Sequence, residues 1–513
     1  MSNDNNNKSS SLMSVIASSS VGTLIEWYDF YIFGSLATVI AAKFFPATNQ
    51  TAALLSTLAT FAAGFIVRPF GALFFGRLGD IIGRKYTFLV TLVLMGGATF
   101  AIGCIPSYET IGFAAPILIL ILRLLQGLAL GGEYGGAATY VSEHTTSKER
   151  GYWTSWIQTT ATLGLFVSLI VILTVQKSMS REAFNDWGWR IPFLVSIALV
   201  IVSIVIRLRM KESPMFSKLK AEGKTSTNPL KESFGNKANF KMVLLALFGA
   251  TMGQGVVWYT GQFYAQLFLL NTCKVDPVQV NTYLGYALLI GTGGFILFGW
   301  LSDKIGRKII MMAGMALALL FTKPLFESLY NHAAVKAKIS QGLELMDKRE
   351  GKAAMSLPAG KTDSVMTSDT TRYFSDGSKY TKKIETIQYA ADKKPAGYAP
   401  KVSELMSLSD ANMMSIMWSI VMLVIFVTMV YGPMAAFLVE LFPTRIRYSS
   451  MSLPYHIGNG VFGGLVPFIG TLIASYVPSD PFIGLVYPLS ITALCLVIGT
   501  FFVSNKINED VNE

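Results

Sequence analysis

Charged residues are scarce in this sequence: Asp, Glu, Lys and Arg make up 14% of its 513 residues, against about 25% in an average soluble protein. Cysteine is scarcer still, and three residues in a chain of this length exclude a secreted scaffold held by disulfide bonds. Apolar residues make up 52%, which leaves too little polar surface to cover a soluble core and excludes disorder. The same scarcity of charge excludes nucleic-acid binding as the reason for the net charge of +11. The composition therefore predicts a protein with many membrane-spanning helices.

Twelve apolar runs are each long enough to cross a bilayer core about 30 Å thick, a distance that takes roughly 20 helical residues. They lie at residues 14–42, 52–75, 87–105, 111–141, 152–175, 191–206, 242–270, 280–301, 309–329, 413–438, 453–476 and 482–502. The preceding residues 1–11 are rich in Asn and Ser and lack the basic stretch of a signal peptide. We therefore expect them to form a cytosolic tail.

Lysine and arginine gather in alternate loops. The loops at 77–85 and 302–308 are basic, as is the segment 207–241, whereas the loops 106–110 and 477–481 contain neither residue. Because cytosolic loops of membrane proteins carry an excess of Lys and Arg, we expect both termini in the cytosol. The net positive charge then reflects this topology rather than recognition of lipid or nucleic acid.

A ten-residue pattern occurs twice in the chain. Gly-Arg-Leu-Gly-Asp-Ile-Ile-Gly-Arg-Lys at 76–85 returns as Gly-Trp-Leu-Ser-Asp-Lys-Ile-Gly-Arg-Lys at 299–308. A glutamate followed seven residues later by an arginine also occurs twice, as Glu143 with Arg150 and as Glu440 with Arg447. The two patterns are further apart in the second half, which indicates an insertion there. An internal repeat of six spans is typical of secondary transporters.

The repeat divides the chain into an N-terminal six-helix half (residues 1–213), a basic cytosolic linker (214–240), a C-terminal six-helix half (241–504) and a cytosolic tail (505–513). Within the second half, residues 330–411 are polar and contain no run that can span a membrane. They lie between the ninth and tenth spans, so we expect an insertion outside the cytosol. In it, Asp376-Gly377 predicts the turn of a β-hairpin.

These motifs resemble those of a known family. The ten-residue pattern resembles motif A of the major facilitator superfamily, although Ile81 stands where a base is usual. Residues 25–30, 68–71, 123–136 and 188–193 are similar to the metabolite:proton symporters of that superfamily, and 211–214 and 440–447 resemble motifs shared with sugar porters. The resemblance implies an all-α membrane protein with twelve transmembrane helices in two pseudo-symmetric six-helix halves, here with an extracytoplasmic insertion between helices 9 and 10. It also implies a multi-pass protein of the bacterial inner membrane that moves small organic acids, amino acids or betaines with protons.

Acidic residues at membrane depth are candidates for proton coupling, because a charge is costly there and faces a cavity or a partner. Glu26 and Asp29 lie on one helix face, since residues three apart are neighbours on a helix. A rise of about 1.5 Å per residue places Glu26, Arg68 and Glu133 near one plane. We expect Glu26, Asp29 and Glu133 to carry the proton. The alternative is that Arg68 and a carboxylate form an ion pair that only holds helices together.

Buried arginines, amides and aromatic residues are candidates for substrate binding. Arg68 and Arg123 favour an organic anion, whereas Trp258 and Tyr259 could form a cation–π cage for a quaternary amine. The amides of the seventh span, at four-residue steps, must face protein or water, either as cavity lining or in hydrogen bonds between helices. The expected substrate-binding residues are Tyr28, Arg68, Arg123, Gln126, Gln254, Trp258, Tyr259 and Gln262.

Charged residues of the repeated cytosolic motifs are candidates for a gate. Acidic residues contribute little to the excess of Lys and Arg that sets membrane topology. The aspartate in both copies of the ten-residue motif therefore indicates a second role. We expect ion pairs to hold the cytosolic side shut and to break as it opens. The alternative is that these loops only set the topology. The expected gating residues are Asp80, Arg84, Glu143, Arg150, Asp303, Arg307, Glu440 and Arg447.

We therefore expect a proton-coupled symporter that works by alternating access and favours an organic acid, such as a di- or tricarboxylate or a cyclic hydroxy acid. A proline- or betaine-type zwitterion is the alternative substrate, and a sensor that signals through the insertion is an alternative of another class. The sequence contains no phosphate-binding loop, metal-ligand cluster or catalytic triad, so we expect no enzymatic activity, no metal and no cofactor. The expected partners are the substrate, protons and the lipid bilayer, with no nucleic acid, and the expected state is a monomer.

Overall fold

The computed structural model describes residues 20, 23–25, 27–45, 50–82, 84–132, 134–142, 145–209, 229–350, 364–388, 401–442 and 446–505. Ten helices within these residues are long and apolar enough to cross a membrane, and the bent pair Thr23–Ser35 and Ala37–Phe44 would add an eleventh. The shorter apolar helix Leu89–Cys104 occupies the third expected run. The helical membrane fold is therefore confirmed, while the count of twelve spans stays a prediction.

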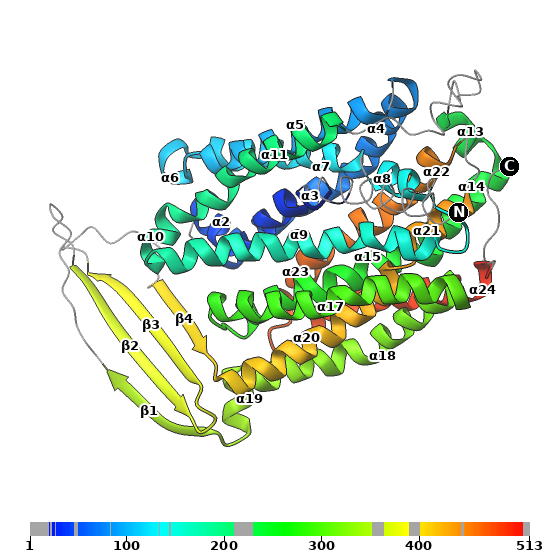
Figure 1. Cartoon of the computed structure of the whole chain (residues 1–513). Coiled ribbons are helices and arrows are strands. Elements are labelled where there is room, and N and C mark those ends of the chain that lie inside the picture. Colours follow the sequence, from blue (N-terminus) through cyan, green and yellow to red (C-terminus); the bar gives the residue numbers. More distant parts are fainter. Residues whose placement is uncertain are drawn as a thin grey trace, which may run out of the picture. The chain divides into compact units, whose positions relative to one another are not determined.

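Long helices follow one another through the first half of the chain (Figure 1). The first span bends by 60° between Ser35 and Ala37, and short connections separate most of the others. The described helices are α2 (Ala37–Phe44), α3 (Gln50–Ile66), α4 (Arg68–Ile82), α5 (Arg84–Cys104), α6 (Tyr108–Ile111), α7 (Ala114–Gly131), α8 (Tyr134–Ser142), α9 (Arg150–Ser178), α10 (Arg181–Asp186), the 3₁₀ turn η1 (Gly188–Arg190) and α11 (Ile191–Arg209).

The second half contains the same kind of helices, and in chain order the strands of a sheet come between α19 and α20. Its α-helices are α13 (Pro229–Gly235), α14 (Lys237–Ala246), α15 (Met252–Trp258), α16 (Ala265–Leu267), α17 (Pro277–Ile305), α18 (Arg307–Ala333), α19 (Val335–Ser340), α20 (Asp410–Tyr431), α21 (Met434–Leu441), α22 (Arg447–Tyr455), α23 (Val466–Tyr476) and α24 (Val486–Phe502), with a 3₁₀ turn η6 (Ile483–Leu485) before the last. Gly306, between α17 and α18, has φ +104°, a left-handed conformation that glycine adopts readily.

Within the described residues, two spans contain π-helical segments. The seventh contains the π-helical segments η2 (Leu247–Thr251), η3 (Tyr259–Tyr264) and η4 (Phe268–Thr272), and the eleventh contains η5 (His456–Gly463). A π-helical turn takes up more residues than an α-helical turn, so a four-residue step no longer returns to one face. The amides of the seventh span therefore do not form the straight stripe that an α-helix would give them.

The polar insertion forms a four-stranded antiparallel sheet. Its strands are β1 (Glu344–Glu350), β2 (Ser364–Phe374), β3 (Lys379–Gln388) and β4 (Lys401–Ser407), in the order β1-β2-β3-β4. Strands β2 and β3 pair from Tyr373 opposite Lys379, next to the turn, to Ser364 opposite Gln388. Gly377, in the turn between them, has φ +81°. The hairpin predicted from Asp-Gly is thus confirmed, with glycine at the position that requires a positive φ.

The chain divides into two compact units. One comprises residues 1–264, 285–323 and 421–513 and contains every described candidate site residue; the other comprises 265–284 and 324–420 and contains the sheet. Within the second unit, the backbone N–H of Met406 in β4 donates to Lys274 at 2.7 Å, and the N–H of Asp276 donates to Met406 at 2.9 Å. The sheet is therefore bonded to the segment that precedes α17.

A buried lysine ties down the hairpin turn. Lys338 of α19, whose side chain is 1% exposed, forms a close ion pair with Asp376. Asn412 of α20 donates to the same carboxylate at 2.8 Å, and the N–H of Ser378 donates to its other oxygen at 2.9 Å. Burial raises the pKa of Asp376, but these donors outweigh burial and lower the pKa to about 2.

The variant Asp376→Asn should loosen this turn. A pKa of about 2, below the ordinary 3.8, means that the ionised carboxylate stabilises the fold at neutral pH and loses this effect as the pH falls from about 4 to about 2. We expect the variant to lose roughly 2 kcal/mol at neutral pH, measured as faster hydrogen exchange of the amides of residues 375–378. In the control Glu404→Gln, whose 3.7 Å pair with Lys382 is partly exposed, exchange should change by less than about threefold. Equal exchange rates in both variants would contradict the prediction.

Candidate functional site

Arg68 stands at a break in the second span. Helix α3 ends at Ile66 and α4 begins at Arg68. Pro69 follows, and proline is accepted in the first turn of a helix because the N–H that it lacks would have no partner there. The break therefore places Arg68 in the first turn of α4, and its side chain is buried.

Two guanidinium groups lie over one aromatic ring. The Cζ atom of Arg68 is 4.4 Å from the centre of the Phe30 ring, and the Cζ atom of Arg123, in α7, is 4.2 Å from the same centre. Each such contact stabilises a cation by about 0.5–2 kcal/mol. The further rings within cation–π distance are Trp27 and Phe65 for Arg68, and Phe33 and Phe61 for Arg123.

Both arginines keep N–H groups that have no acceptor among the residues that the structure describes. Within the described residues, Nε and Nη2 of Arg68 and of Arg123 have no hydrogen-bond partner, and neither guanidinium group is in an ion pair with a described carboxylate. A buried charge is costly unless it is paired and hydrogen-bonded. The two Cζ atoms are no further apart than the sum of their distances to the Phe30 ring centre, so two cationic groups are buried close together. The arrangement is suited to an anion.

Asp29 precedes Phe30 in the first span but faces a different neighbour. Its carboxyl group is buried, and neither oxygen has a hydrogen-bond partner within the described residues. Thr99 of α5 interacts with it, and a Cβ atom placed on Gly96, also in α5, would be 3.4 Å from its Oδ2. A buried acid without fixed partners is a candidate for binding and releasing a proton.

The other expected proton carriers, Glu26 and Glu133, lie outside the described residues. Tyr28 is described, and its hydroxyl donates to the carbonyl of Pro192 at 2.9 Å. That bond joins the first span to the start of α11. The role of Tyr28 in substrate binding stays a prediction.

Gln126 links Arg123, on the same helix α7, to Thr99 of α5. Nη1 of Arg123 donates to Oε1 of Gln126 at 2.7 Å, and Nε2 of Gln126 donates to Oγ1 of Thr99 at 2.7 Å. All three side chains are buried. Because the two bonds use both ends of the amide, they fix its orientation.

Aromatic rings of the seventh span pack on those of the first. Trp258 stacks on Tyr31 with ring centres 5.3 Å apart, and Tyr31 stacks on Trp27 at 5.1 Å. Tyr259 meets the edge of Phe65 at 5.2 Å. Trp258 and Tyr259 therefore lie in the same aromatic cluster as Arg68.

The two expected amides of the seventh span differ in their partners. Gln262 exchanges hydrogen bonds with Thr162 of α9, the shorter at 3.2 Å. Gln254 is buried, and neither atom of its amide has a partner within the described residues. Gln262 thus joins helices in this structure, whereas Gln254 keeps a donor and an acceptor that a ligand could use.

Sequence reasoning missed a group of tyrosines that joins the two halves. The rings of Tyr134 in α8 and Tyr455 in α22 stack with centres 3.5 Å apart. The hydroxyl groups of Tyr431 and Tyr455 are 2.6 Å apart, and Gln158 donates to Tyr134 at 2.6 Å. Tyr134 belongs to the segment 123–136 that resembles the metabolite:proton symporters, and no feature of the sequence pairs it with Tyr455. Phe30 and Thr99 were missed in the same way.

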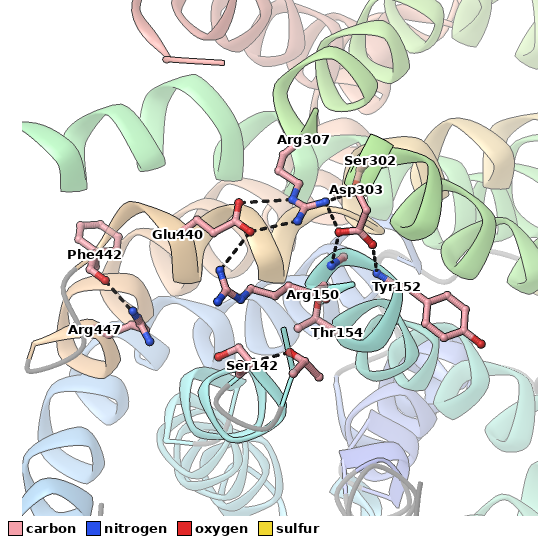
Figure 2. Close-up of polar contacts among 12 residues, drawn as sticks. Ser142, Arg150, Tyr152, Thr154, Ser302, Asp303, Arg307, Glu440, Phe442 and Arg447 are labelled. Carbon is pink, nitrogen blue, oxygen red and sulfur yellow. Dashed lines mark hydrogen bonds and ion pairs between the residues drawn. The ribbon is translucent and has the colours of Figure 1, made fainter. Parts of the chain in front are cut away.

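Asp303 holds the beginning of α9 (Figure 2). Its two oxygens accept the backbone N–H groups of Gly151 and Tyr152, both at 2.8 Å, and Oδ1 also pairs with Arg307 at 2.5 Å. A carboxylate is favoured at a helix N-terminus, where N–H groups lack partners inside the helix. A Cβ atom on Gly151 would lie 2.8 Å from Oδ1 of Asp303, so this close approach needs glycine.

Glu440, at the end of α21, receives two arginines. Nη2 of Arg307 lies 3.0 Å from its Oε1, and Nη1 of Arg150 lies 3.3 Å from the same oxygen. Arg307 therefore joins Asp303 to Glu440, and all four side chains are nearly buried. The network connects α9, from the first half of the chain, to α17, α18 and α21, from the second half.

The other expected gating residues are only partly described. Nε of Arg447 donates to the carbonyl of Phe442 at 3.1 Å. Glu143 lies outside the described residues, as do the side chains of Asp80 and Arg84. The spacing of the sequence pairs Glu143 with Arg150 and Glu440 with Arg447. The structure adds Arg150 and Arg307 as partners of Glu440 that this spacing does not assign, because they come from other helices.

Removing the charge of Asp303 should weaken this network. In Asp303→Asn, the contacts with Arg307, Gly151 and Tyr152 lose a charged acceptor. Ion pairs that hold the cytosolic side shut shift the equilibrium between the closed and open states by about 1–3 kcal/mol, roughly 5- to 150-fold. We expect engineered cysteines near the cytosolic ends of α17 and α22 to react faster with a polar thiol reagent, and turnover to slow while substrate binding is retained. The control Asp186→Asn removes an acid whose side chain is 86% exposed in its pair with Lys43 and should change neither rate. Parental labelling and turnover in Asp303→Asn would show that the loop only sets topology.

Comparison with known proteins places the chain among transporters. A family model described as "Sugar (and other) transporter" matches residues 15–245. The chain is 32% identical over 316 residues to the alpha-ketoglutarate permease of Escherichia coli (strain K12), a match that covers 62% of this chain and 72% of that protein. It is 33% identical over 331 residues to the proline/betaine transporter of the same organism, with 61% of this chain and 64% of that protein covered.

A solved structure shares the fold. The xylose transporter XylE from E. coli, in a partially occluded inward open conformation, superposes with a TM-score of 0.61 over 97% of this chain and 99% of that chain. The two sequences are 15% identical. At that level the likeness concerns the arrangement of helices alone.

Proposed function

Because the chain belongs to the major facilitator superfamily of membrane transporters, we propose that it is a proton-coupled symporter of a small organic acid. Similarity to an alpha-ketoglutarate permease supports an acid with two carboxylates, and the resemblance of its motifs to metabolite:proton symporters supports proton coupling.

The observation that carries the proposal is the pair of arginines around Phe30. Arg68 and Arg123 are buried, hold N–H groups without an acceptor in the described part of the chain, and lie close together over one ring. Guanidinium groups bind carboxylates through two parallel hydrogen bonds, which gives geometric selectivity as well as energy. An organic dianion supplies negative charge that no described residue provides to these two arginines.

The proposed transport cycle gives each group of charged residues a role. Asp29 takes up a proton from outside, and the substrate places its carboxylates on Arg68 and Arg123. The network of Asp303, Arg307 and Glu440 then opens, and the substrate and the proton leave to the cytosol. Over the cycle, the protein changes from an outward-facing to an inward-facing state and back, which is alternating access.

A zwitterion is the second candidate substrate. The stacked rings of Trp27, Tyr31 and Trp258 offer aromatic faces to a quaternary amine, and the chain is similar to a proline/betaine transporter. The same arginines would then hold the single carboxylate of the zwitterion.

Uptake by proteoliposomes tests the proposal. Vesicles that contain the purified protein are given labelled alpha-ketoglutarate, citrate, a cyclic hydroxy acid, proline or glycine betaine, with and without an inward proton gradient. We expect at least one acid to accumulate only with the gradient, and a protonophore to abolish accumulation. Accumulation of proline or betaine alone would favour the zwitterion, and uptake that ignores the gradient would contradict proton coupling.

A further inference from the structure

Three buried residues of the seventh and eleventh spans keep hydrogen-bonding atoms that have no partner in the described part of the chain. They are both ring nitrogens of His456 in η5, Oδ1 of Asn459 in η5, and both amide atoms of Gln254 in α15. None of the three residues is more than 3% exposed. Buried polar atoms normally have a partner, because an unpaired one forfeits its hydration without compensation. These atoms therefore call for partners that the described chain does not supply.

The seventh and eleventh spans lie side by side at this level. Oγ1 of Thr251 in η2 donates to the carbonyl of Pro454 in α22 at 2.8 Å. Four and five residues further along the two spans, a Cβ atom on Gly255 would lie 2.7 Å from the Cα atom of Asn459. The two backbones therefore run in the same direction and in contact, and the unpartnered residues of both spans fall within this stretch.

Arg68 packs against the same stretch of the eleventh span. A Cβ atom on Gly460 would lie 3.4 Å from Cδ of Arg68 and 3.5 Å from the carbonyl oxygen of Phe65 in α3. Gly460 directly follows Asn459 and comes four residues after His456. His456 is also close enough to Arg68 for the charge of the guanidinium group to act on it. A substrate whose carboxylate is held by Arg68 thus has the eleventh span beside it.

The unpartnered atoms include both donors and acceptors. An imidazole with its ordinary pKa of about 6.5 is mostly neutral at neutral pH, and in either tautomer one nitrogen donates while the other accepts. The amide of Gln254 also donates and accepts, and Oδ1 of Asn459 accepts. A carboxylate or keto group of a ligand can only accept, and a quaternary amine has no N–H to donate. A hydroxyl group both donates and accepts.

We propose that His456, together with Gln254 and Asn459, binds a hydroxyl group of the substrate, so that the protein selects a hydroxy acid over the same acid without that group. This inference rests on the proposed function and adds to it the class of acid and three specificity-determining residues. The carboxylate binds to Arg68, and the hydroxyl group exchanges hydrogen bonds with the two neighbouring spans. An acid without the hydroxyl group leaves buried donors and acceptors unpaired, which lowers its affinity.

The test compares acids that differ by one hydroxyl group. Malate and succinate form one such pair, and citrate and tricarballylate form another. Each acid is measured in proteoliposomes under the same inward proton gradient, as labelled substrate or as a competitor of a labelled acid. For the parent protein, we expect the apparent KM of the hydroxy acid to be roughly 10- to 100-fold below that of its counterpart in at least one pair.

Variants of His456 and Gln254 test which side chains make the distinction. His456→Phe keeps a ring but removes both nitrogens, and we expect it to reduce the difference within the pair by roughly 5- to 10-fold. The loss should come from a higher KM of the hydroxy acid, while the KM of its counterpart stays within about threefold of the parental value. Gln254→Met keeps the length of the side chain without the amide and should act in the same direction. His456→Gln keeps a donor and an acceptor and should retain most of the difference.

Two controls separate specificity from folding. An unchanged KM for the acid without the hydroxyl group shows that a variant is folded and inserted, because that acid uses the same arginines. Thr492→Val in α24 removes a buried hydroxyl group that already donates to the carbonyl of Pro488 at 2.7 Å. This variant should keep the parental difference between the two acids.

The outcomes distinguish this inference from the proposed function. If the parent protein accumulates no acid with a proton gradient, the proposed function fails and this inference fails with it. If the parent accumulates an acid but neither hydroxy acid has a lower KM than its counterpart, water rather than substrate fills these positions, and the inference is overturned while the function stands. An equal rise in KM for both acids of a pair in His456→Phe would make His456 a structural residue and would also overturn the inference.

Discussion

Replacing Asp29 by asparagine should abolish accumulation of the substrate against its gradient while leaving exchange of substrate across the membrane. Asparagine is neutral, like a protonated aspartate, so the loaded protein can still change between its two states. It cannot release a proton on the cytosolic side, so the proton gradient no longer drives the cycle. The carboxyl group is buried and has no hydrogen-bond partner in the described residues, which leaves little else for the substitution to disrupt.

The measurement is paired uptake and counterflow in proteoliposomes. We expect proteoliposomes with Asp29→Asn to accumulate less than about a tenth as much substrate as those with the parent protein. A tenfold loss corresponds to about 1.4 kcal/mol of driving free energy that the proton no longer supplies. Counterflow should be retained. Glu26→Gln should act in the same way, because the two acids share a helix face in the sequence. Full accumulation in both single variants would contradict the assignment of the proton site.

Replacing Arg68 by lysine should raise the apparent KM for the acid by roughly tenfold or more, because lysine loses the planar fork that holds both oxygens of a carboxylate. Lysine also packs less well against the rings of Trp27, Phe30 and Phe65, which now face the guanidinium group. Arg68→Ala should raise KM further.

A matched control lies in the same helix. Arg77 of α4 is exposed, and Arg77→Lys should leave KM within about twofold because exposed charges contribute little. An unchanged KM in a correctly inserted Arg68→Ala protein would leave Arg68 a structural residue. An equal rise in KM for an acid and for betaine would indicate that Arg68 binds a carboxylate group, which both substrates contain.

The sequence predicts the helices and the charged residues better than it predicts their partners. Apolar runs long enough for a bilayer admit few alternatives, and Asp-Gly between polar strands indicates a hairpin because only a few residues accept its positive φ. The repeated motif likewise identifies Asp303 and Arg307. For the helices and the hairpin, a local or compositional rule carries the prediction, and the structure agrees with it. The gating role of Asp303 and Arg307 stays a prediction.

What the sequence does not contain is which helices face one another. Arg150 meets Glu440, and Tyr134 meets Tyr455, across long separations in the chain. Thr99 is one threonine among several in apolar helices, most of which bond to their own backbone. Only the packing of α5 against α7 and the first span distinguishes it from them.

The π-helical segments of the seventh span matter for how this chain is compared with others. Each such turn holds about one residue more than an α-helical turn, and one residue corresponds to roughly 100° of rotation about the helix axis. A relative whose seventh span is α-helical throughout must therefore be aligned with a one-residue gap in each of the three π-helical segments. One of these gaps falls within η3, Tyr259–Tyr264. Without the gap, Gln266 and every later residue of the span are matched to positions on the wrong side of the helix. A single-residue deletion inside η3 would turn that part of the span away from its neighbours, although it removes no charged residue.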